Sequence, residues 1–118
     1  MRDRNVVLEK TMAFAVRIVN LYKYLANDKS EYVLSKQILK SGTSIGANAK
    51  EAMSGQSKND FISKLSISLK EASETEYWLE LLMRTDYIQK REYISLNSDC
   101  VEIIKLLTSI IKTSKENQ

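Results

Sequence analysis

The chain has 118 residues, of which 43% are apolar and 28% are charged, and its formal net charge is +3. This length fits one domain, and the apolar share is too high for a chain that is disordered throughout. The sequence contains no histidine and a single cysteine, Cys100, so it lacks the commonest general base and metal ligand. We therefore expect a protein that is not an enzyme and that binds no cofactor or metal.

The spacing of apolar residues predicts four helices, and the absence of proline favours long, uninterrupted ones. The first helix is expected over residues 5–25. Its apolar positions cover roughly half of the circumference, wider than the stripe of about 100° that a surface helix buries. The second is expected over residues 31–53, after the turn "ANDKSE", in which Asp28 and Ser30 are candidate N-caps.

The third helix is expected over residues 58–85, with Ser57 as its N-cap and Asp60 three positions later, a variant of the capping box. The fourth is expected over residues 89–113 and also has a wide apolar side. Short connections make consecutive helices antiparallel neighbours. We therefore expect a single all-α domain over residues 1–118, folded as an antiparallel up-down-up-down four-helix bundle.

The cellular setting follows from what the sequence lacks. One cysteine cannot form an internal disulfide, which fits a reducing compartment. The sequence shows no signal-peptide pattern and no run of about 18 apolar residues. We expect a cytoplasmic protein without membrane contact.

All three glycines lie in the stretch "KSGTSIGANAKEAMSGQSKND", residues 40–60. A phosphate-binding loop needs Gly-x-x-x-x-Gly-Lys-Ser/Thr after a strand, whereas here the glycine spacing is one residue shorter and the flanks are helical. Gly42 and Gly46 share one helix face, and each costs up to about 1 kcal/mol relative to alanine. We interpret them as a seam that a neighbouring helix approaches closely. An exposed contact to another subunit or a ligand is the alternative.

The segments "LSKQILKSGTSIGANAKEA" and "SKNDFISKLSISLKEASETEYWLELL" resemble the bacterial four helix bundle protein family, first noticed as reading frames inside intervening sequences of 23S ribosomal RNA genes. The resemblance extends from Val6 to about Lys112. The matching positions are Gln37, Ser41, Ser44, Ile45, Asn48, Glu51, Ser57, Lys58, Phe61, Leu65, Glu74 and Leu79.

This resemblance implies an antiparallel four-helix bundle that assembles into a homopentameric ring. A related member is the accessory protein of diversity-generating retroelements, which partners a reverse transcriptase and binds nucleic acid. Many relatives carry "GRRSKKEF" at the turn into the third helix, where this chain has "SGQSKNDF". Uncharged residues thus replace several cations at this turn.

Five lysines are the candidate contacts to RNA or DNA, because binding to the phosphate backbone requires a row of cations. They are Lys36, Lys40, Lys50, Lys58 and Lys64. A ring would repeat this patch and add avidity. The alternative is an ordinary solvated helix face.

Three further residues are candidates for packing or a subunit interface, beside Gly42 and Gly46. Asn48 lies on the apolar stripe and, if buried, needs a hydrogen-bond partner. Glu51 accompanies it one turn later. Trp78 is expected to anchor the core or an interface, with base stacking as the alternative.

The first hypothesis is a non-enzymatic homo-oligomer that binds nucleic acid or a nucleoprotein through repeated basic patches. The second is a scaffold that binds another protein and no nucleic acid. A third is an enzyme whose site forms only between subunits.

Overall fold

The computed structural model describes residues 2–117, and these residues form four helices and no strand. The helices are α1 (Arg2–Asn27), α2 (Leu34–Met53), α3 (Lys58–Arg84) and α4 (Lys90–Glu116). The expectation of an all-α chain with four helices is confirmed. The absence of proline explains why three of the helices continue for 26 or 27 residues without a break.

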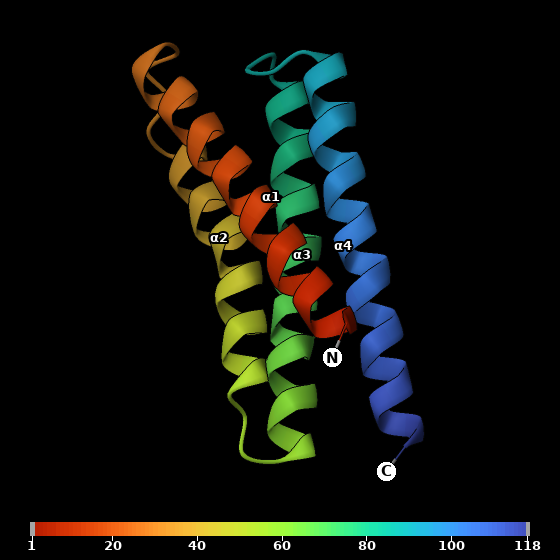
Figure 1. Cartoon of the computed structure of the whole chain (residues 1–118). Coiled ribbons are helices and arrows are strands. Elements are labelled where there is room, and N and C mark those ends of the chain that lie inside the picture. The colour runs from red at the N-terminus through yellow and green to blue at the C-terminus, as the bar shows by residue number, and fades with distance from the viewer. Residues whose placement is uncertain (1, 118) are drawn as a thin grey trace.

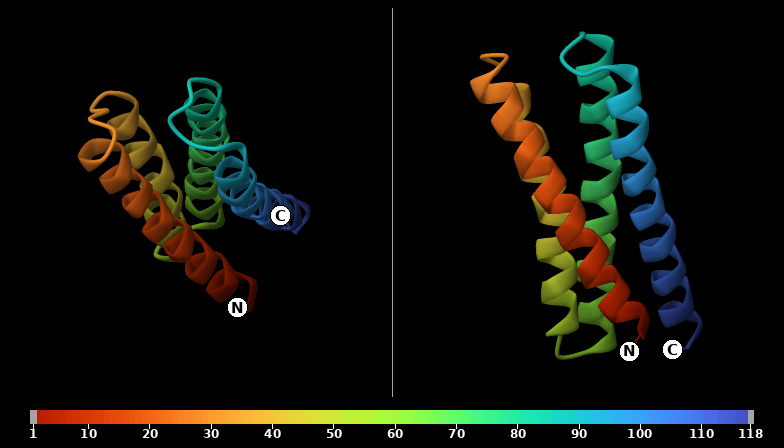
Figure 2. Two further views of the ribbon diagram at one scale, coloured as in Figure 1. Left: turned by 90° about the horizontal axis from the view of Figure 1, so that it is seen from above. Right: turned by 45° about the horizontal axis from the view of Figure 1, so that its top comes forward.

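Consecutive helices run in opposite directions along a long axis, so the start of α1 and the end of α4 lie towards the same end of the molecule (Figures 1 and 2). The principal extents are 47 × 21 × 19 Å. α1 and α3 each pack against both α2 and α4, and the contact between α1 and α4 is the sparsest of the four. This arrangement is compatible with the expected bundle.

The connection between α1 and α2 differs from its prediction. α2 begins at Leu34, and neither Asp28 nor Ser30 caps it. Instead, the carboxylate of Glu31 accepts hydrogen bonds from the backbone N–H groups of Val33, Leu34 and Ser35 at 3.1, 3.0 and 2.6 Å. These N–H groups have no partner within the helix, so Glu31 satisfies the start of α2 from outside it.

Burial raises the pKa of the Glu31 carboxyl, but the hydrogen bonds from the backbone of Leu34, Ser35 and Val33 outweigh this effect, and its pKa lies below the ordinary value. The charged form of Glu31 is therefore stabilised by the folded chain.

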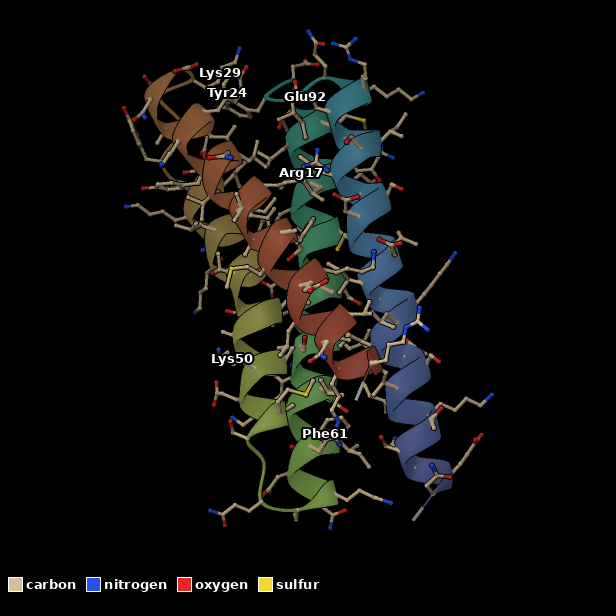
Figure 3. The ribbon with its side chains drawn as sticks, viewed as in Figure 1. Arg17, Tyr24, Lys29, Lys50, Phe61 and Glu92 are labelled. Atoms are coloured by element: carbon tan, nitrogen blue, oxygen red, sulfur yellow. The ribbon has the colours of Figure 1, made fainter. Side chains whose placement is uncertain are left out.

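At the start of α3, the predicted cap is confirmed, because the Ser57 hydroxyl accepts from the N–H of Asp60 at 3.1 Å. The guanidinium of Arg4 lies 4.5 Å from the centre of the Phe61 ring, which Figure 3 labels in the first turn of α3. The beginning of α1 is thereby held over the beginning of α3.

The core lies along the axis between the helices and contains aliphatic side chains from all four. The largest of its fully buried side chains include Phe14, Ile18, Leu25, Ile38, Ile45, Leu65, Leu79, Leu82 and Leu107. Between α2 and α3 this core also contains hydroxyl groups. The Ser68 hydroxyl donates to the carbonyl of Ile45 at 2.7 Å, and the hydroxyl oxygens of Thr75 and Ser41 are 2.9 Å apart. Small hydroxyl residues let these two helices approach while every polar group named keeps a partner.

Candidate interaction surfaces

The stretch that holds the three glycines is the second half of α2, a short turn, and the start of α3. At Gly42 an added Cβ would lie 2.8 Å from both Cγ1 and Cγ2 of Ile18. At Gly46 the corresponding distance to Cβ and Oγ1 of Thr11 is 3.2 Å. The two glycines therefore lie against α1, at positions where a side chain would crowd Ile18 or Thr11.

Three of the candidate lysines lie on the outer side of α2. Lys36, Lys40 and Lys50 are exposed, and none of them forms an ion pair among the residues that the structure describes. Figure 3 shows Lys50 projecting away from the other helices. Residues 34–50 contain these three lysines and no acidic residue, so this length of α2 carries uncompensated positive charge.

The other two lysines have partners. Lys58 donates from Nζ to the carbonyl oxygen of Asn117 at 2.7 Å, which joins the start of α3 to the end of α4. Nζ of Lys64 lies 3.1 Å from a carboxylate oxygen of Glu51, across the α2–α3 contact. The structure thus separates the five lysines into a free group on α2 and an engaged pair on α3.

The polar pair Asn48 and Glu51 does not act together. The Asn48 amide donates to the carbonyl of Ser44 at 2.8 Å, so its hydrogen-bond partner lies within its own helix. Glu51 pairs with Lys64 instead. Glu51 and Lys64 border an open polar depression of about 520 Å³ beside the α2–α3 turn.

Trp78 is half-buried and packs on the edge of the core. Its indole N–H donates to Glu74 at 3.2 Å, and its ring meets that of Tyr77 edge-on, with 5.1 Å between the centres. Tyr77 itself is 61% exposed. An aromatic pair and a carboxylate therefore lie together on the outward side of α3.

A second apolar surface is the groove between α1 and α2, called here the α1–α2 groove. It has a volume of about 280 Å³, and its lining includes Leu8, Met12, Ala15, Thr43, Ala47 and Lys50. Met12 is 65% exposed and Val16, one turn further along α1, is 53% exposed. The wide apolar face predicted for the first helix is thus only partly covered.

Cys100 is buried, and its thiol donates to the carbonyl of Ala72 at 3.3 Å. Burial, with smaller contributions from the charges of Glu76 and Asp99, raises the pKa of this thiol to about 12. The thiolate, which is the reactive form, is therefore scarce at neutral pH.

Within residues 2–117, no three side chains of the kinds that ligate metals cluster closely enough to hold an ion. Over the same residues, none of the helices combines the length and hydropathy that a membrane span requires.

Some of these features had no clear signal in the sequence. Glu31 as a cap depends on a turn that brings its carboxylate back onto the helix start. The α1–α2 groove depends on which side of α1 faces the other helices. On α3, Trp78 was predicted to anchor the core or an interface, whereas the edge-on contact of Tyr77 with it had no signal in the sequence.

Comparison with known proteins identifies a family and a similar solved structure. The family described as 23S rRNA-intervening sequence protein matches residues 3–109. The crystal structure of a protein of unknown function from the S23 ribosomal protein family of Bacteroides thetaiotaomicron is 64% identical and superimposes with a TM-score of 0.92, covering 93% of this chain and 98% of that one. Among functionally curated proteins no match is found.

Proposed function

Because this chain belongs to the family of 23S rRNA-intervening sequence proteins, we propose that it is a cytoplasmic, non-enzymatic homo-oligomer of antiparallel four-helix bundles that binds RNA or DNA through repeated basic patches. The patch on each copy consists of Lys36 and Lys40, extended along α2 by Lys50. A homopentameric ring is the assembly that the family resemblance implies.

The observation that supports this proposal is the free row of lysines on α2. Lys36 and Lys40 are one turn apart, and Lys50 follows about 15 Å further along the helix at a rise of about 1.5 Å per residue. Neither Lys36 nor Lys40 has a carboxylate partner among residues 2–117. Such a row matches a phosphate backbone and makes no base-specific demand.

A single row of three cations binds weakly. Closed homo-oligomers repeat each surface at fixed positions, so one strand of nucleic acid can touch several copies at once. The second contact then becomes intramolecular, and the total affinity rises by orders of magnitude.

A second candidate function is a scaffold that binds another polypeptide. Two observations favour it. Met12 and Val16 expose apolar surface in the middle of a long helix, and the α2–α3 turn carries Ser54, Gly55 and Gln56 rather than cations. A protein partner would bind the exposed apolar surface of Met12 and Val16, and its affinity would not depend on the lysines.

The test is the salt dependence of binding to single-stranded RNA and DNA. We expect affinity to fall steeply between about 50 and 200 mM salt, and the logarithmic slope should decrease by roughly 0.7 for each phosphate that a variant no longer neutralises. Lys36→Glu and Lys40→Glu should weaken binding at every salt concentration. Lys112→Glu makes the same charge change at an exposed residue of α4. It is the matched control and should weaken binding less.

No retention of the unmodified protein on RNA or single-stranded DNA at low salt would reject nucleic-acid binding and leave the scaffold as the proposed function.

A further inference from the structure

Two surfaces of the chain expose apolar side chains in the middle of long helices. One is the α1–α2 groove, with Met12 on its α1 side and Val16 exposed one turn further along α1. The other, called here the outer α3 face, carries Ile67, Glu71, Glu74 and Trp78 at steps of four, three and four residues, with Tyr77 beside Trp78. This spacing places them on one side of the helix.

The outer α3 face carries apolar side chains at its two ends, with Glu71 and Glu74 between them. Ile67 is 40% exposed and Tyr77 is 61% exposed, while Trp78 packs at the core edge with Tyr77 against it. Aromatic side chains of this kind are the common anchors of protein interfaces. The end of the face that carries Tyr77 and Trp78 is therefore suited to enter an apolar groove.

The charges around the two surfaces are opposite. Lys50 is the charged residue in the lining of the groove, whereas residues 71–83 of α3, which follow Lys70, contain four glutamates and no lysine or arginine. If two copies met through their grooves, or through their outer α3 faces, like charges would come together, which is unfavourable. Groove against face brings Lys50 towards the side that carries Glu71 and Glu74.

We propose that the α1–α2 groove of one copy of this chain receives the outer α3 face of a second copy. This inference rests on the proposed homo-oligomer and specifies its contact. The two surfaces are different, so each copy in a pair keeps one unused groove or face. Such a heterologous contact continues from copy to copy until a ring closes.

The proposal also divides the lysines by role. Lys50 lines the groove and lies in the proposed subunit contact, so assembly reduces the lysine patch of each copy to Lys36 and Lys40. Lys36 and Lys40 lie closer to the start of α2, outside the groove lining. They remain available for nucleic acid.

The test uses one substitution on each surface. Met12→Glu places a carboxylate in the groove, and Tyr77→Lys places a cation on the outer α3 face. Both side chains are mostly exposed in one copy, so circular dichroism should show folded protein in each case. Ile94→Glu, at a residue of α4 that is 55% exposed, is the matched control outside both surfaces.

Light scattering should give a multiple of 13.5 kDa for the unmodified protein and for Ile94→Glu, and 13.5 kDa for Met12→Glu and for Tyr77→Lys. Mixing the last two should restore association to at least a 1:1 dimer, because the first keeps an intact outer α3 face and the second an intact groove.

The outcomes separate the two proposals. An unmodified protein of 13.5 kDa overturns the homo-oligomer and this contact together. An assembled unmodified protein overturns the contact alone if either single variant stays assembled, if the mixture remains monomeric, or if Ile94→Glu dissociates it.

Discussion

The two flanks of α1 are built in opposite ways. Towards α2, α1 meets Gly42 and Gly46, and a Cβ at Gly42 would come within 2.8 Å of Ile18. Towards α4, α1 is joined by long polar side chains. Arg17 Nη1 donates to Asp99 at 2.6 Å, and its other terminal nitrogen donates to the Ser95 hydroxyl at 2.9 Å. Figure 3 shows Arg17 between α1 and α4.

α1 is therefore held against its two neighbouring helices by two different kinds of contact. On the α2 side two glycines allow close contact between the helices, and Gly46 and Thr11 also line the open α1–α2 groove. The α4 side spans a wider separation with partly exposed ion pairs, Lys10 with Glu102 and Arg17 with Asp99. Exposed pairs contribute little to stability because water and salt screen them. We therefore expect α1 to depend on α2 far more than on α4.

The largest effect should come from Gly42→Ala. Ile18 is fully buried, so it must move away from the new methyl group, and such overpacking costs about 1–3 kcal/mol. The better helix propensity of alanine offsets at most about 1 kcal/mol of that loss. Chemical denaturation should show a lower free energy of unfolding.

Gly46→Ala is the matched control, because its Cβ would lie 3.2 Å from Thr11 and requires a movement of only a few tenths of an ångström. Its effect should be clearly smaller than that of Gly42→Ala.

Combining Gly42→Ala with Ile18→Ala should cost less than the sum of the two single changes, since the cavity takes up the methyl group. An additive result would show that the two residues do not press on each other.

An intermediate effect is expected at the connection that holds α1 and α2 together. Glu31→Ala leaves the N–H groups of Val33, Leu34 and Ser35 without their acceptor, and loss of a helix cap costs about 0.5–2 kcal/mol. Glu31→Gln, which keeps an oxygen acceptor, should cost less. Thermal unfolding of the two variants beside the unmodified protein measures both.

The contribution of Glu31 should also depend on pH. Its pKa is lowered in the folded chain from an ordinary value of 4.5, so the stabilisation is complete above that value and is lost as the pH falls through the folded pKa. The stability difference between the unmodified protein and Glu31→Gln should therefore shrink in acid. A difference that stays constant from neutral pH into acid would assign the effect to packing rather than to charge.

The smallest effect should come from the α4 side. Arg17→Ala removes an ion pair whose two side chains are 39% and 46% exposed, and pairs of this kind contribute about 0.2–1 kcal/mol. The loss should diminish as salt is added. A loss as large as that of Gly42→Ala, unaffected by salt, would reverse the comparison between the two flanks.

The sequence was sufficient for the four helices because their periodicity and the absence of proline are local properties. α2 begins at Leu34 rather than at the predicted residue 31. Glu31 caps the helix through a turn, and helix propensity does not indicate such a turn. The glycine pair indicated a close approach, but the sequence could not tell that Ile18 lies opposite Gly42. That pairing depends on the register of α1 against α2, which the whole fold sets.

For the candidate lysines too, local sequence predicts one property and not another. Their exposure follows from helical spacing. Which of them is free depends on neighbours that are remote in sequence: Lys58 reaches Asn117, and Lys64 reaches Glu51 across a turn. Spacing alone could not distinguish these two from Lys36 and Lys40.

The most direct test of the account is the mass of the unmodified protein in solution, because the repeated lysine patch and the contact between groove and outer α3 face both require several copies. Light scattering at micromolar concentration should give a multiple of 13.5 kDa, five-fold for the proposed ring. A mass of 13.5 kDa would contradict the account.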